Sequence, residues 1–175
     1  YITASVGRRV MGSWTLDDIP WERFDPAKVD AEILRIVKAA SLVEQNGADY
    51  ARYLRGVFHD DEAFRHVAQL WGAEEVQHGQ ALGRWAMLAD PGFDHEAASR
   101  RFTAGFRVDL EAERSVRGSR AGELVARCIV ETGTSSYYTA LAEAAAEPLL
   151  QEICRRIAAD ELRHYKLFYG HLTRY

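Results

Sequence analysis

Ala73 to Gly79 reads A-E-E-V-Q-H-G, and Ala159 to Tyr165 reads A-D-E-L-R-H-Y. Each stretch has two acids, two other residues and a histidine in the same order. In an α-helix, residues three positions apart lie on one face, one turn apart. The second acid of each stretch therefore faces the same way as its histidine. These pairs are Glu75 with His78 and Glu161 with His164.

The helix faces that carry these pairs are otherwise apolar. At helical spacing, Trp71 and Leu82 flank Glu75, and Ile157 flanks Glu161. An ionised carboxylate on an apolar face is unfavourable unless it is paired or bound to a metal ion. A single Glu-x-x-His pair is most often a surface pair, but two copies on apolar faces favour metal ligation.

Two lone glutamates, Glu44 and Glu131, fall on apolar stripes of two other helical stretches. Each precedes one Glu-x-x-His pair by almost the same number of residues, as two equivalent hairpins would give. One Glu from each of two helices and Glu-x-x-His from two others is the ligand pattern of di-iron and di-manganese carboxylate proteins. We therefore predict a site for two Fe ions, with Mn/Fe as the alternative. The predicted ligands are Glu44, Glu75, His78, Glu131, Glu161 and His164.

Strand signals are almost absent, and the few prolines stand where helices can begin or end. The sequence predicts four long helices, at about Pro26–Phe58, Asp61–Ala89, Arg120–Ala145 and from Pro148 towards Tyr175. A shorter helical pattern, around His95–Val108, lies in the long connection between the second and third. Short links make two antiparallel hairpins, and the long connection can cross the bundle. We predict an all-α, ferritin-like four-helix bundle, one domain over residues 1–175, with residues 1–25 packing on it as an N-terminal extension.

The composition narrows the class of protein. The chain has 175 residues, 47% of them apolar, and a net charge of −4, which gives no reason to expect nucleic-acid binding. The two cysteines, Cys128 and Cys154, form no C-x-x-C pair and suit a reducing, cytoplasmic location as small core residues. No apolar run approaches the ~20 residues of a membrane span, so we expect none.

Two longer motifs surround the predicted ligands. W-G-A-E-E-V-Q-H-G at Trp71–Gly79 and I-A-A-D-E-L-R-H at Ile157–His164 resemble the two metal motifs of the soluble acyl-[acyl carrier protein] desaturases. Those motifs are W-x-A-E-E-x-x-H-G and I-A-A-D-E-x-R-H. The S-W pair at Ser13 and Trp14, followed by D-D-I-P, resembles the N-terminal tryptophan segment of that family. Family members are usually much longer, and the long connection shows no clear match.

The resemblance implies roles for further residues. Asp160 would hydrogen-bond His78 across the bundle, with Trp14 as its further partner, and Glu74 would serve His164 in the same way. The alternative for both acids is a solvated helix flank. By the same resemblance, Glu75 and Glu161 would bridge the two ions. Thr134 is expected to line the oxygen-binding side of the centre.

The function that the resemblance implies is an O₂-dependent di-iron oxidase, which removes hydrogen from an unactivated C–H bond of an acyl or similar carrier-bound substrate. The expected partners are O₂, acyl carrier protein or a small apolar substrate, an external electron donor such as ferredoxin, and a second copy in a homodimer. Six arginines between Arg100 and Arg120 outnumber three acids there and are a candidate surface for an acidic carrier. A solvated face explains them equally well.

Other di-iron classes remain as alternatives. A ferroxidase, peroxide-scavenging or metal-storage protein of the bacterioferritin or rubrerythrin type also has two Glu-x-x-His motifs, but the flanking residues here fit desaturases better. A ribonucleotide-reductase-like protein would have a tyrosine where this chain has Leu82. A non-catalytic bundle would leave buried acids uncompensated.

Several small residues and histidines allow more specific expectations. Gly47 and Gly133 lie near the predicted ligands Glu44 and Glu131, where they either make room for a substrate or allow close helix packing. Among the remaining histidines, those expected to be solvated are His59, His66 and His95. His171 is expected in the core or along a channel.

Overall fold

The computed structural model describes residues 14–175. Residues 1–13, which include Ser13 and the first part of the predicted N-terminal extension, lie outside the described residues. Within residues 14–175 the regular structure consists of six α-helices and three 3₁₀ turns, without strands. The predicted all-α fold is confirmed. None of the helices in this range has the length and apolar character that crossing a bilayer requires.

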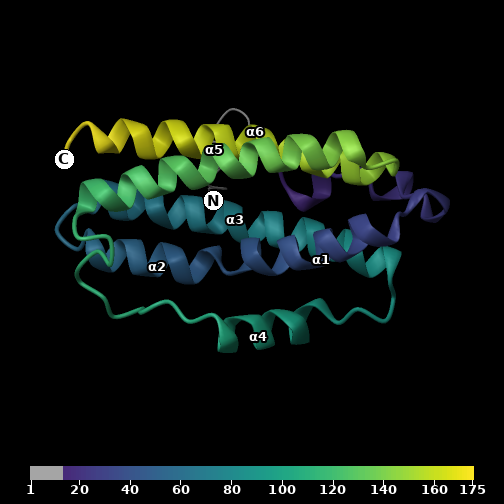
Figure 1. Ribbon diagram of the computed structural model, residues 1–175, viewed down its shortest axis with the longest axis horizontal. Helices are drawn as coiled ribbons and strands as arrows, with labels where there is room; N and C mark the ends of the chain where they lie inside the picture. The colour runs from purple at the N-terminus through teal and green to yellow at the C-terminus, as the bar shows by residue number, and fades with distance from the viewer. Residues whose placement is uncertain (1–13) are drawn as a thin grey trace, which may run out of the picture.

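The helices form two antiparallel hairpins joined by a long connection (Figure 1). One hairpin pairs α1 (Ala31–Gln45) and α2 (Gly47–Val57) with α3 (Glu62–Ala89), and the other pairs α5 (Arg120–Ala144) with α6 (Pro148–Leu172). The connection carries α4 (His95–Gly105), which packs outside the bundle against α1. Because the connection returns along the length of the bundle, α3 and α5 run in the same direction (Figure 1).

Side-chain caps set where three of the long helices begin. The Asp61 carboxylate accepts a hydrogen bond from the Phe64 N–H at 3.0 Å, and Ser119 Oγ accepts one from Gly122 N–H at 3.0 Å. Glu147 caps α6 through the N–H groups of Leu149 and Leu150, and it also accepts from Trp85 Nε1 at 2.7 Å. These starts agree with the predicted ones to within one residue.

The predicted helix over Pro26–Phe58 is wrong in its first part and in its continuity. Pro26–Lys28 forms only a 3₁₀ turn, and α1 begins after Asp30, whose carboxylate caps it through the N–H of Glu32 at 2.8 Å. Asn46 then separates α1 from α2, because its N–H bonds to the carbonyl of Val43, three residues back, at 3.1 Å. The break directly follows the last turn of α1, which carries Glu44.

Gly47 explains how the two helices of the first hairpin approach so closely. A Cβ built on Gly47 would lie 2.3 Å from the Cβ of Glu75, so only glycine allows α2 to begin against α3 there. Close packing is therefore the reason for Gly47. At Gly133, which is exposed on α5, a Cβ would meet no described atom within 4 Å, so packing does not account for that glycine.

Two apolar layers make up the core, one towards each end of the bundle. The first contains Leu82, Trp85 and Ile153, and the second contains Phe64 and Phe168, all fully buried. Cys154 lies in the first layer and Cys128 in the second, as expected for small core residues. The two Glu-x-x-His pairs come between these layers along both α3 and α6, so polar side chains occupy the middle of the bundle.

The described part of the N-terminal extension packs on the first apolar layer. It folds into the turns η1 (Leu16–Asp18) and η2 (Trp21–Arg23), and the turn η3 (Pro26–Lys28) follows directly after it. Trp14 and Ile19 are buried, and the Trp14 carbonyl accepts a hydrogen bond from Gln77 Nε2 at 3.0 Å. The segment therefore reaches α3 one residue away from His78.

Two glycine-to-alanine substitutions should shift stability in opposite directions. Gly47→Ala forces a methyl group against the first side-chain carbons of Glu75 on α3 and should lower the free energy of unfolding by about 1–3 kcal/mol. Gly133→Ala adds an exposed methyl group inside a helix and should raise it by up to about 1 kcal/mol. Urea unfolding of both variants measures this, and a neutral Gly47→Ala would contradict the close approach of α2 and α3.

Candidate metal centre

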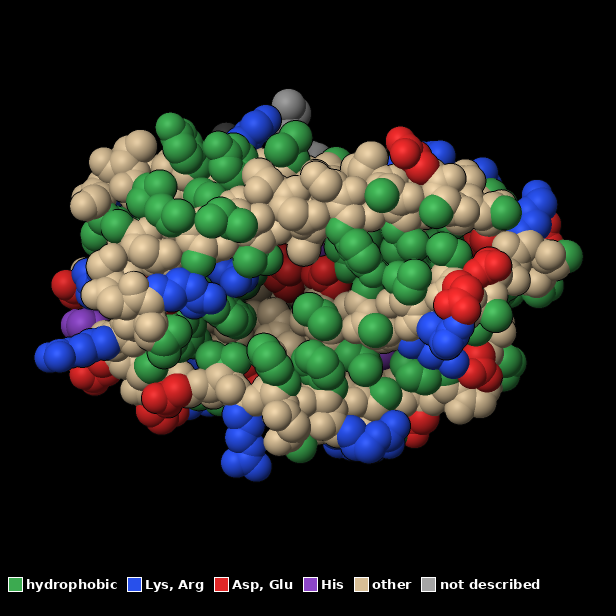
Figure 2. All heavy atoms as spheres, viewed as in Figure 1, with side chains coloured by type: hydrophobic (Ala, Val, Ile, Leu, Met, Phe, Trp, Pro, Cys, Tyr) green, Lys and Arg blue, Asp and Glu red, His purple; other side chains and the backbone are tan. Residues whose placement is uncertain are grey.

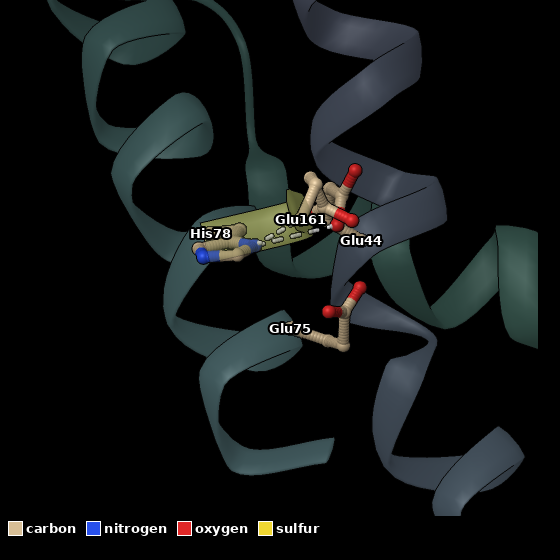
Figure 3. A group of neighbouring side chains, drawn as sticks. All are labelled: Glu44, Glu75, His78 and Glu161. Atoms are coloured by element: carbon tan, nitrogen blue, oxygen red, sulfur yellow. Dashed lines mark ion pairs between the residues drawn. The ribbon is translucent and has the colours of Figure 1, made fainter. Parts of the chain in front are cut away.

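All six predicted ligands meet in the middle of the bundle, and each is at least nine-tenths buried. Glu44 comes from α1, Glu75 and His78 from α3, Glu131 from α5, and Glu161 and His164 from α6. Figure 3 shows four of them, with Glu44, Glu75 and Glu161 turned towards His78 or towards one another. The structure thus brings together side chains from four helices.

Ligand atoms of these residues fall into two overlapping groups, and within each group they lie within 4.8 Å of one another. The first group is Glu44, Glu75, His78 and Glu161, and the second is Glu75, Glu131, Glu161 and His164. Each group can hold a metal ion. Glu75 and Glu161 belong to both groups, so these two carboxylates lie between the possible ion positions.

The His78 ring is held from both sides. Its Nδ1 points into the cluster, 3.2 Å from Glu161 Oε1, while its Nε2 donates to Asp160 Oδ2 at 3.1 Å. The same Asp160 oxygen accepts a hydrogen bond from Trp14 Nε1 at 2.8 Å, and the Trp14 ring stacks on His78 with 5.8 Å between ring centroids. Asp160 is 4% exposed, so it is not a solvated flank. These contacts leave Nδ1 as the free nitrogen that faces the carboxylates.

The His164 ring has the same arrangement on the other side of the centre. Its Nδ1 lies 3.0 Å from Glu75 Oε1 and 3.5 Å from Glu131 Oε2. Its Nε2 donates to Glu74 Oε2 at 2.7 Å. Each histidine therefore presents Nδ1 to the cluster and is oriented through Nε2 by a carboxylate from the opposite helix.

Arg163 joins the two outer carboxylates and was not singled out from the sequence. Its guanidinium donates to Asp160 Oδ1 at 2.6 Å and lies 3.3 Å from Glu74 Oε2. The only signal in the sequence was its place in D-E-L-R-H, immediately before His164. One cation thus neutralises part of the charge of both carboxylates that orient the histidines.

Two hydroxyl groups contact the cluster. Thr134 Oγ1 lies 2.8 Å from Glu161 Oε2, beside the cavity described below. Tyr138 donates a hydrogen bond to Glu44 Oε1 and is fully buried. Tyr138 lies seven residues after Glu131 and shares its helix face, which was the only signal in the sequence. Its hydroxyl fixes one oxygen of Glu44.

Several buried polar atoms of this cluster lie close to one another but do not have the geometry of a hydrogen bond with any partner. They include Glu75 Oε1, Glu131 Oε2, Glu161 Oε1 and the Nδ1 atoms of both histidines. A buried polar atom without a partner is unfavourable by about 1–3 kcal/mol. Carboxylate oxygens and imidazole nitrogens are suitable ligands for iron or manganese. The donor set therefore fits metal ions, which would supply the partners that these atoms lack.

Burial and mutual repulsion shift the pKa values of the carboxyl groups. Burial raises the pKa of Glu75 well above its usual value, and the charges of Glu161 and Glu44 raise it further. Burial likewise raises the pKa of Glu131 to about 7. For His78, burial favours the neutral ring, but Asp160 and the other neighbouring carboxylates outweigh it and raise the pKa. Without a cation, Glu75 and Glu131 therefore tend to hold protons that a metal ion would displace.

A cavity of about 370 Å³ opens onto the centre. Its apolar walls include Val43, Tyr50, Phe102, Phe106 and Val130, and Glu75, Glu131 and Glu161 face it at the inner end. Figure 2 shows the hollow between the upper and lower helices, with acidic side chains at its floor and hydrophobic side chains around it. A small apolar molecule in this cavity would lie against the carboxylates.

The family model for fatty acid desaturases matches residues 36–174, which include all six candidate ligands. The chain belongs to the fatty acid desaturase family. Comparisons with curated proteins and with solved structures gave no match. The match begins within α1 and continues past the end of α6, so it covers most of the bundle and its crossover as well as the two motifs.

The prediction for His95 is wrong. His59 and His66 are exposed as expected, but the His95 ring packs on α3, where a Cβ on Gly83 would come within 2.6 Å of it. Burial lowers the pKa of His95. The reason is that α4 folds back on the bundle, which its own periodicity did not indicate. His171 is partly buried beside Phe64, with 5.2 Å between ring centroids.

Metal-free protein should lose stability as the pH rises from about 4.5 to about 7. The raised pKa of Glu131 means that the folded state binds a proton which the unfolded state has released in this window. Glu131→Gln should flatten this part of the stability profile, measured by urea unfolding in the presence of a chelator. With metal bound the trend should reverse, since protons and metal compete for the carboxylates. An unchanged profile in Glu131→Gln would contradict the assigned pKa.

Asp160→Asn should weaken metal binding about 10- to 100-fold, because an amide no longer holds His78 as a carboxylate does. Trp14→Phe should have a smaller effect, since it keeps the stacking and removes one hydrogen bond to Asp160. Competition with a chelator of known affinity measures both. Equal affinities in Asp160→Asn and the parent protein would show that this carboxylate does not position the ring.

Proposed function

We propose that the chain is an O₂-dependent di-iron oxidase of the desaturase type, built on a ferritin-like bundle, that removes hydrogen from an unactivated C–H bond of an acyl substrate. The observation that carries this proposal is the pair of overlapping ligand groups at the inner end of an apolar cavity. Membership of the fatty acid desaturase family supports the same reaction class.

In this proposal the two ions have similar ligand sets. Glu44 and His78 would hold one ion, Glu131 and His164 would hold the other, and Glu75 and Glu161, which belong to both ligand groups, would be shared between them. Two Fe ions are the proposed cofactor, with Mn/Fe as the alternative, because the ligand types suit both. When bound and reduced, such a centre supplies the activation of O₂.

The chain itself would orient the two histidine rings, exclude water from the centre and give the substrate access to it. Asp160 and Glu74 keep Nδ1 of each histidine directed at the metal positions. The apolar walls exclude water and accept a hydrocarbon group, which must lie in contact with the inner carboxylates to react. Thr134 Oγ1, bonded to Glu161, can hold or pass a proton at the boundary between cavity and cluster.

The proposed reaction also requires partners that deliver electrons and substrate. An external electron donor such as ferredoxin must reduce the centre, and the family resemblance favours a homodimer. An acyl carrier protein would dock on the exposed arginines between Arg100 and Arg120, near the cavity wall formed by Phe102 and Phe106. Within the described residues, Arg100, Arg117 and Arg120 already pair with acids, so Arg101, Arg107 and Arg114 are the ones to test.

Metal analysis should find about two ions per chain, and Glu75→Ala combined with Glu161→Ala should abolish binding of both. The exposed Glu113→Ala and Glu143→Ala together make the matched control and should keep full loading. Anaerobically reduced, iron-loaded protein mixed with O₂ should form an oxidised or unsaturated product from an acyl substrate.

Other outcomes of this experiment separate the competing functions. Rapid catalytic oxidation of Fe(II) with assembly into a hollow shell, and no acyl product, would favour the ferroxidase or storage alternative. Metal loading that the double substitution leaves unchanged would exclude this cluster as the centre.

A further inference from the structure

Arg127 lines the cavity from α5, one helical turn before Glu131. The residue is only 8% exposed. Its guanidinium lies over the Tyr50 ring, 4.2 Å from the ring centroid, and 5.9 Å from the centroid of Trp71. Two aromatic walls of the cavity therefore hold this cation in place inside the substrate space.

Within residues 14–175 this guanidinium has neither an ion-pair partner nor a hydrogen-bond acceptor, and its Nε is fully buried without a partner. The two nearest carboxylates along the helix, each four residues away, are directed elsewhere. Glu123 pairs with Arg117 at 2.8 Å, and Glu131 lies 3.5 Å from His164 Nδ1. A buried charge without a counter-ion is strongly unfavourable. Contacts with aromatic faces compensate only part of this and leave the N–H donors unused.

Three other arginines with partly covered side chains pair with acids, whereas Arg55, which lines a different pocket, also has a buried Nε without a partner. Arg117 bonds to Glu123 at 2.8 Å, Arg120 to Asp60 at 2.5 Å, and Arg163 to Asp160 at 2.6 Å. The side chains of these three arginines are 26–36% exposed, whereas Arg127 is 8% exposed. The most buried of these four cations is thus the unpaired one, and it faces a cavity.

We propose that Arg127 binds the carboxylate of a free organic acid, whose apolar body fills the cavity and reaches the centre. This inference rests on the proposed oxidase function and narrows its substrate to the free acid, in place of the carrier-bound acyl group and its docking on the surface arginines. A carrier-bound thioester is uncharged at its carbonyl and would leave the guanidinium without a counter-ion. An arginine fork matches a carboxylate with two parallel hydrogen bonds.

The positions along α5 set the distance between the acid group and the reacting carbon. Arg127 precedes Glu131 by one turn and Thr134 by two, which is about 6 Å and about 10 Å along the helix axis. A carboxylate at Arg127 therefore places a carbon several bonds away against the inner carboxylates. The cavity volume of about 370 Å³ lies near the lower end of the range for small-molecule sites, which favours an acid of modest size.

Octanoate and octanamide are suitable probes, because they share a chain and a carbonyl oxygen and differ in charge. Titration calorimetry on anaerobic, Fe(II)-loaded protein should show octanoate binding at least about tenfold more tightly than octanamide. Arg127→Met should remove this preference and leave octanamide binding within about threefold. Arg127→Lys, which keeps the charge but not the fork, should retain part of it.

The control variant is Arg155→Met, which removes an exposed arginine of α6 outside the cavity and should keep the full preference. Arg127→Met removes an unpaired buried charge, so its thermal midpoint should not fall. If that variant does not fold, the affinities of octanoate and octanamide for the parent protein and for Arg127→Lys still test the proposal. Equal affinity for the two probes, binding of neither, or a preference that survives Arg127→Met overturns the proposal.

Metal content, measured on the same samples, separates this inference from the proposed function. If the protein binds no iron but prefers octanoate to octanamide through Arg127, the acid site is supported and the di-iron oxidase is excluded. Two ions per chain without any octanoate preference would leave the oxidase standing and overturn the acid site.

Discussion

Four carboxylates and two imidazoles packed between apolar layers are the constraint on which this structure depends. Placing like charges together in a region without water is unfavourable, and the surrounding groups only partly relieve it. Tyr138, Thr134 and the outer acids bond to some atoms of the cluster, and the atoms that face one another remain without partners. A bound metal ion would supply the missing partners, and the same cluster would then stabilise the folded state.

Two local features of the first hairpin determine where its ligands lie relative to the rest of the cluster. Gly47 lets α2 start in van der Waals contact with α3, and the break at Asn46 ends α1 directly after Glu44. The same break contributes to the cavity wall, because Asn46 and Gly47 line it beside Glu44. A local interruption of one helix thus both positions a ligand and opens a path to it.

Periodicity predicted much of the fold and all six residues of the cluster, because a buried acid on an apolar stripe stands out in a single sequence. What it missed depends on contacts between distant segments. The Asn46 break, the packing of His95 on Gly83 and the hydrogen bond from Tyr138 to Glu44 each need a partner that is remote in the chain. The burial of Arg127 could not be predicted for the same reason. An arginine in a helix is normally solvated, and only the folded chain shows that this one is buried.

Arg163 gives the two halves of the centre a common support. It contacts both Asp160 and Glu74, and these hold His78 and His164 respectively. A shift of either imidazole therefore reaches the other through a single guanidinium, without passing through the inner carboxylates. If two ions bind as proposed, this shared guanidinium would couple their positions, so that filling one would organise the other. Loading would then proceed cooperatively, with few singly occupied molecules at intermediate metal concentrations.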